Sequence, residues 1–137
     1  MANAMYNKGR QAILNGTVDL LTDNLKVILI DVADYTVNLS TDDNLDDVPA
    51  AARVATSGNL AGKSVADGVF DATDVTFTAV TGDQSEALVI YRDSGLESTS
   101  SLIAYIDTAS AGLPVTPNGG NITVTWSNGA NKIFNWS

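Results

Sequence analysis

Two apolar runs on either side of a turn-forming segment make the strongest hydrophobic pattern in the chain. The runs cover residues 87–91 and 102–106, and the polar segment 93–101 lies between them. Both runs are rich in β-branched and aromatic residues, which suit a pleated and half-buried surface. Each is also too short for a free-standing helix. The pattern therefore predicts an antiparallel strand pair at the centre of a sheet.

Three further segments show strand patterns. Residues 26–32, KVILIDV, form the most apolar run and are typical of a buried strand. Residues 75–80 alternate, with Val75, Phe77 and Ala79 on one face. Residues 122–126 also alternate, and their apolar positions are separated by threonines.

Turn signals separate these segments. Asp67-Gly68 lies between Ser64-Val65 and Val69-Phe70 and is a candidate hairpin turn. Asn128-Gly129 is the clearest type I′ signal, with residues 132–136 as the strand that closes the sheet.

Two segments differ from the strands. Residues 3–15 place apolar side chains at helical spacing, interrupted by Gly9, and Gly16 is a plausible stop, so 1–16 is an N-terminal helical segment. Residues 34–52 carry four Asp within six residues and few large apolar groups, which predicts a long acidic surface loop. A single helical turn is expected near residues 43–48.

The predicted fold is one domain over residues 1–137. It is mainly β, an antiparallel β-sandwich or open barrel with a short N-terminal helix and a long acidic loop. The residues expected to be buried are Val27, Leu29, Val89, Tyr91, Ile103, Tyr105, Val124 and Trp126.

Charge and composition narrow the classes of function. A net charge of −9 and a pI near 4.1 argue against nucleic acid or an anionic membrane as the main partner. The chain has no Cys and no His, which removes the commonest nucleophile, general base and metal ligands. No run reaches the roughly 20 apolar residues of a membrane span, and the first residues lack the apolar region of a signal peptide. We therefore expect synthesis in a cytoplasm.

The acidic loop raises the question of a cation site. Asp42, Asp43, Asp46 and Asp47 could bind Ca²⁺ through carboxylate oxygens. Their spacing does not fit an EF-hand, and runs of this kind are usually solvated, so we predict no metal site.

No other group of residues indicates catalysis. Asp71 and Asp74 could form an acid–base pair, but turn residues before a strand are the simpler interpretation. Trp126 and Trp136 could stack on sugar rings, although aromatic residues in alternating strands are usually core. We predict no enzyme activity, no catalytic residue and no cofactor.

Six blocks of the chain carry a resemblance to known proteins: LLTDNLKVILIDVADYTVNL, NLDDVP, FDATDVTFTAV, ALVIYRDSG, SLIAYIDT and NGGNITVTWSNGANKIFNW. Together they resemble a group of small tailed-bacteriophage virion proteins. In that group a short helix precedes a strand like 26–32, and the chain ends on a strand pair like 121–136. The blocks contain no chemical motif, so the resemblance implies a structural part of a phage particle without specifying the part.

The resemblance favours a capsid decoration, or cement, protein that binds the major capsid protein and is present as a homo-oligomer, with a trimer favoured. A neck, collar or tail-associated virion protein is the alternative. A small carbohydrate-binding β-sandwich is the alternative from a different class. In the first two cases the protein is made in the bacterial cytoplasm and ends in the virion.

Attachment to a particle would use segments that are not needed to complete the sheet. One of two segments, the helix or the loop, is expected to dock onto a neighbouring subunit or the major capsid protein. The alternative is that the helix covers an open end of the sheet and the loop is solvated. The candidate contact residues are Met5, Tyr6, Lys8, Arg10 and Ile13 in the helix, and Leu39, Leu45 and Val48 in the loop.

Overall fold

The computed structural model describes residues 4–107, 113–126 and 133–135. Within them lie one α-helix, three short 3-10 turns and ten strands. The helical elements are α1 (Asn7–Leu14), η1 (Leu45–Asp47), η2 (Ala50–Ala52) and η3 (Glu97–Thr99). The strands are β1 (Ala4–Met5), β2 (Leu25–Ile30), β3 (Arg53–Thr56), β4 (Ser64–Ala66), β5 (Val69–Asp71), β6 (Val75–Phe77), β7 (Ala87–Arg92), β8 (Leu102–Ile106), β9 (Ile122–Val124) and β10 (Phe134–Asn135).

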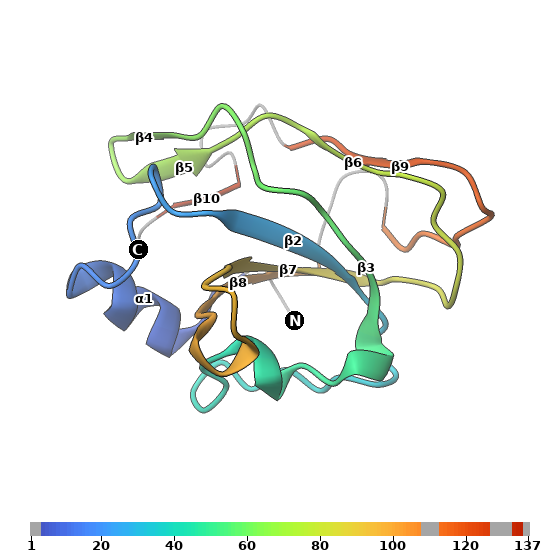
Figure 1. Ribbon diagram of the computed structural model, residues 1–137, viewed down its shortest axis with the longest axis horizontal. Coiled ribbons are helices and arrows are strands. Elements are labelled where there is room, and N and C mark those ends of the chain that lie inside the picture. Colours follow the sequence, from blue (N-terminus) through green and yellow to red (C-terminus); the bar gives the residue numbers. More distant parts are fainter. Residues whose placement is uncertain (1–3, 108–112, 127–132, 136–137) are drawn as a thin grey trace.

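The strands form one large sheet and two small ones. The large sheet has the order β1-β8-β7-β2-β3, and the small sheets have the orders β10-β5-β4 and β6-β9. All neighbouring strands are antiparallel. Figure 1 shows the small sheets above the large sheet, while α1 and the 3-10 turns lie below it. The fold is thus mainly antiparallel β with a short N-terminal helix, as the sequence predicts, and the large sheet stays open.

The predicted strand pair is confirmed as β7 and β8, in which Val89 lies opposite Tyr105. Every residue of β8 is buried, and β7 is buried up to its last residue. The two strands are apolar throughout because both faces of the large sheet are covered. One face packs on the small sheets, and the other packs on the chain between β2 and β3.

The set of residues expected to be buried is confirmed at every position except Val124, which is half-buried in the two-stranded β6–β9 sheet. The structure divides the set between the two faces of the large sheet. Four of the residues belong to the core between the large sheet and the small sheets, and three belong to the core on the opposite side of the large sheet. The first group is Val27, Leu29, Ile103 and Trp126, and the second is Val89, Tyr91 and Tyr105.

The N-terminal segment is shorter in helix than expected. Helix α1 begins at Asn7, because residues 4–5 pair with β8 as an edge strand and Tyr6 donates its backbone N–H to the Ile103 carbonyl. The predicted stop is confirmed: Gly16 follows the helix with a φ of 81°, and its N–H bonds to the Ile13 carbonyl.

The turn at Asp67-Gly68 is confirmed as the connection between β4 and β5. Both residues have positive φ, 51° and 77°, as a type I′ turn requires. The alternation predicted for residues 75–80 stops at Phe77, because Ala79 takes a φ of 49° and is exposed.

The predicted strand pair at the end of the chain is not formed among the described residues. Strand β9 pairs with β6, and β10 pairs with β5. The two late strands therefore belong to different small sheets, and each pairs with a strand from earlier in the chain. The turn predicted at Asn128-Gly129 lies outside the described residues.

Candidate functional site

The acidic segment 34–52 covers the lower face of the large sheet. The expected helical turn is present as η1, but the expected solvated loop is wrong for its apolar residues. Tyr35, Leu45, Val48 and Ala52 are all buried. They pack against the apolar side chains that β2, β7 and β8 direct to this face, Ile28, Ile30, Ala87, Val89, Tyr91, Leu102 and Tyr105.

A buried chain of hydrogen bonds fastens this covering segment to the N-terminal segment. The Tyr6 and Tyr35 hydroxyls lie 2.9 Å apart, and Tyr35 donates to Asp42 Oδ2 at 2.7 Å. The Asn38 N–H donates to the same carboxylate oxygen at 2.9 Å. Burial raises the pKa of both tyrosines, which keeps the hydroxyls neutral so that they can donate.

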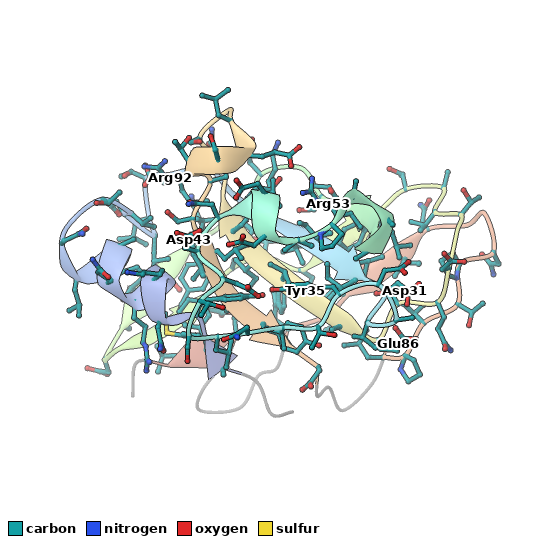
Figure 2. All side chains as sticks on the ribbon, turned by 90° about the horizontal axis from the view of Figure 1, so that it is seen from below. Asp31, Tyr35, Asp43, Arg53, Glu86 and Arg92 are labelled. Carbon is teal, nitrogen blue, oxygen red and sulfur yellow. The ribbon has the colours of Figure 1, made fainter. Side chains whose placement is uncertain are left out.

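Arg53 joins the covering segment to the β7–β8 connection. Its Nη2 donates to the Leu45 carbonyl at 2.8 Å and to Glu97 Oε1 at 2.8 Å, and its Nε donates to the Val48 carbonyl at 3.0 Å. The guanidinium holds the pKa of Glu97 below its usual range. Turns η1 and η3 are therefore held together by a single side chain, that of Arg53, which Figure 2 labels.

The carboxylates of Asp43, Asp46 and Asp47 come within 4.8 Å of one another at η1. Asp47 Oδ2 accepts the Asp43 N–H at 2.8 Å, and a reciprocal capping box joins Asp47 to Asn44. The backbone N–H of Asp43 lowers the pKa of Asp47, whereas burial and the Asp47 carboxylate raise the pKa of Asp43. The cluster caps a turn, and a spacing of this kind is common among exposed acidic groups without an ion.

Asp42 lies apart from this cluster, since Tyr35 and Asn38 bind its carboxylate. A second carboxylate cluster, which the sequence analysis missed, joins Asp31, Asp34 and Asp83. Asp31 is buried and accepts the Ala33 N–H at 2.9 Å. No sequence signal identifies this group. Asp83 precedes β7 and Asp31 follows β2, and the pairing of these two antiparallel strands brings the two residues together.

The remaining candidates for chemistry have structural roles. Asp74 lies directly before β6, and its Oδ1 accepts the Trp126 N–H at 2.9 Å, so its carboxylate holds the chain after β9 against the start of β6. Asp71 ends β5 opposite Ser64. Trp126 is buried and donates its indole N–H to the Thr73 carbonyl at 3.1 Å, so it offers no stacking surface for a sugar. Trp136 lies outside the described residues.

The predicted contact residues separate into two groups. Met5, Tyr6, Leu45 and Val48 are buried within this chain, because β1 and the covering segment complete its core. These four are core residues of this fold and do not form the exposed contact surface that the sequence analysis expected. Lys8 is exposed, and Arg10, Ile13 and Leu39 are half-buried, so contact with a partner at these four residues stays a prediction.

No family model and no curated protein sequence matches the chain. Among the described residues, no helix is long and apolar enough to cross a membrane.

Proposed function

We propose that this chain is a non-enzymatic structural protein of a tailed-bacteriophage virion and acts as a capsid decoration protein bound to the major capsid protein. The observation that carries the proposal is the resemblance of its sequence blocks to small virion proteins of such phages. Three of those blocks include β2, β7 and β8, the centre of the large sheet. The resemblance therefore covers the part of the chain that organises the fold.

The use of the polar side chains supports a structural role over a catalytic one. Asp42 and Asp47 accept backbone N–H groups, and Arg53 holds carbonyl groups of the covering segment. These side chains stabilise irregular backbone over a buried sheet face. A small module with both sheet faces covered suits repeated use on a shell, where many modest contacts add up.

Mass spectrometry of purified virions tests the proposal. We expect the chain in a copy number comparable with that of the major capsid protein, and density for it on the capsid exterior in a reconstruction of the particle. A copy number equal to one ring would instead indicate the neck, collar or tail. Absence of the chain from the particles would overturn the virion proposal.

The carbohydrate-binding alternative has a direct test of its own. Because Trp126 is buried, sugar binding would need a different surface. Retention of the purified protein on immobilised glycans, undiminished by Trp126→Phe, would favour that alternative.

A further inference from the structure

The exposed face of α1 differs in charge from the rest of this acidic protein. Residues 1–18 contain no Asp or Glu, while the chain as a whole carries −9. On α1, Lys8 bonds to the amide oxygen of Gln11, and Arg10 bonds to that of Asn7. Both positive charges are therefore available to an acidic partner.

The other lysines and arginines among the described residues bind carboxylates or a backbone carbonyl of the same chain. Lys26 pairs with Asp93, Arg53 with Glu97 and Arg92 with Asp23, and Lys63 donates to the Asp23 carbonyl. Among the described residues, Lys8 and Arg10 bond only to neutral side-chain amides, so no carboxylate of the chain balances their positive charges.

An exposed leucine lies on the same face of α1 as the two cations, at the C-terminal end of the helix. Leu14 exposes 75% of its surface, the largest fraction among the exposed large apolar residues of the described chain. At 100° per residue, Arg10 and Lys8 fall on the two edges of the exposed face of α1, and Leu14 falls between them. We call Lys8, Arg10 and Leu14 the helix patch.

The unit formed by η1 and η3 presents the opposite combination. Asp46, Asp47 and Glu97 are exposed there, and the neighbouring Leu96 exposes 66% of its surface. Arg53 binds both turns and fixes their relative position. We call Asp46, Asp47, Leu96 and Glu97 the turn patch.

We propose that the helix patch of one copy of this chain docks onto the turn patch of a second copy. Two cations would meet a group of three carboxylates, of which Glu97 already pairs with Arg53 and Asp47 already caps η1, so Asp46 is the carboxylate with most to gain. Leu14 would lose water against Leu96. Figure 1 shows α1 and the two turns below the large sheet, so a symmetric oligomer can engage both patches of every copy. The contact involves this chain alone, so the virion proposal does not depend on it.

Small-angle scattering of the purified protein measures the association. We expect the apparent mass to rise above the 14.3 kDa of one chain as the concentration approaches about 1 mM in low salt, and to fall when salt screens the charges. The variant Lys8→Gln/Arg10→Gln should remain at the mass of one chain. A wild-type protein that stays monomeric throughout this range would overturn the proposal.

A matched variant distinguishes the loss of attraction between the two patches from the general repulsion that a more negative net charge causes. Asn59→Glu/Thr78→Glu changes the net charge by the same two units at exposed positions outside both patches. It should associate like the wild type. The proposal fails if this control loses association as fully as Lys8→Gln/Arg10→Gln does, because repulsion between whole molecules would then explain the result.

Charge reversal supplies a positive test. Lys8→Glu/Arg10→Glu reverses the charge of the helix patch and leaves the turn patch intact. Asp46→Lys/Ser98→Lys leaves the helix patch intact and places two lysines beside Asp47 and Glu97, so the turn patch loses its negative charge without a change to the capping residue Asp47. In a mixture, the intact helix patch of the second variant can meet the intact turn patch of the first. We expect each variant alone to be monomeric and an equimolar mixture to associate. Circular dichroism melts check that both variants are folded, and a mixture of folded variants that stays monomeric would contradict the pairing.

Discussion

Gly9 is a helical residue whose missing side chain decides how closely α1 approaches the sheet. A Cβ at this position would lie 2.4 Å from the Leu102 carbonyl oxygen and 2.9 Å from the Ile103 Cα. Both atoms belong to the backbone of β8, so neither can move aside without disturbing the sheet. The sequence pattern shows Gly9 only as an interruption of a helical face, because the partner strand is far away along the chain.

We expect Gly9→Ala to destabilise the protein by about 1–3 kcal/mol, since α1 must move away from β8. The measurement is urea unfolding followed by circular dichroism. Gly58→Ala is the matched control, because a Cβ there meets nothing within 4 Å. Equal stabilities of the two variants would show that α1 does not pack closely on β8.

The covering segment 34–52 shows at the scale of an element what sequence reasoning can and cannot find. Its acidic character, its lack of strands and its turn near Leu45 were all predictable from local composition. The burial of Tyr35 and Val48 was not, because irregular chain has no period that marks a buried side. Only the large sheet supplies the surface that these residues cover.

Tyr35 should fasten this segment through its hydroxyl. Tyr35→Phe removes the donor to Asp42 and leaves the buried Tyr6 hydroxyl without that partner, so we expect a loss of about 1–3 kcal/mol in unfolding free energy. A double-mutant cycle with Tyr6→Phe should show coupling between the two hydroxyls. Tyr105→Phe is the control, because its ring packs on Tyr35 but its hydroxyl lies outside this chain of hydrogen bonds. Additive effects in the cycle would contradict the coupling.

The central strands should carry most of the stability. Truncation of Leu29 or Ile103 to Ala removes a side chain with no exposed surface, and we expect each change to cost about 2–5 kcal/mol. Leu21→Ala, at a position that is 49% exposed, should change stability by no more than about 0.5 kcal/mol. Thermal melts within a degree or two of the wild type for both core variants would mean that the central strands are misplaced.

At the scale of the whole molecule, the strands were largely predictable and their assembly was not. Alternation and apolar runs located β2, β7, β8 and β9 because these signals are local. The pairing of β9 with β6 and of β10 with β5 depends on tertiary contacts between distant segments. The cluster at Asp31 stayed hidden for the same reason, since its third carboxylate comes from a different part of the chain.

The balance of carboxylate contacts predicts how the whole protein responds to acid. The Asp43 N–H lowers the pKa of Asp47, Lys26 lowers that of Asp93, and Arg53 lowers that of Glu97. These groups bind protons more weakly in the folded state, so their stabilisation is present above a pH of about 4 and is lost as the pH falls through their folded pKa values. Asp43, whose pKa is raised by burial, has the opposite sign.

The backbone N–H of Leu21 lowers the pKa of Asp19 as well. Because four lowered groups oppose one raised group, we expect the free energy of unfolding to fall as the pH drops below about 4. Urea unfolding across this range measures it. Asp93→Asn should flatten the dependence by about 0.2–1 kcal/mol, a small amount because the pair with Lys26 is partly exposed and screened by solvent. Lys26→Met should flatten it by a similar amount, since both changes remove the same ion pair. An unchanged slope in both variants would mean that this pair does not contribute to acid sensitivity.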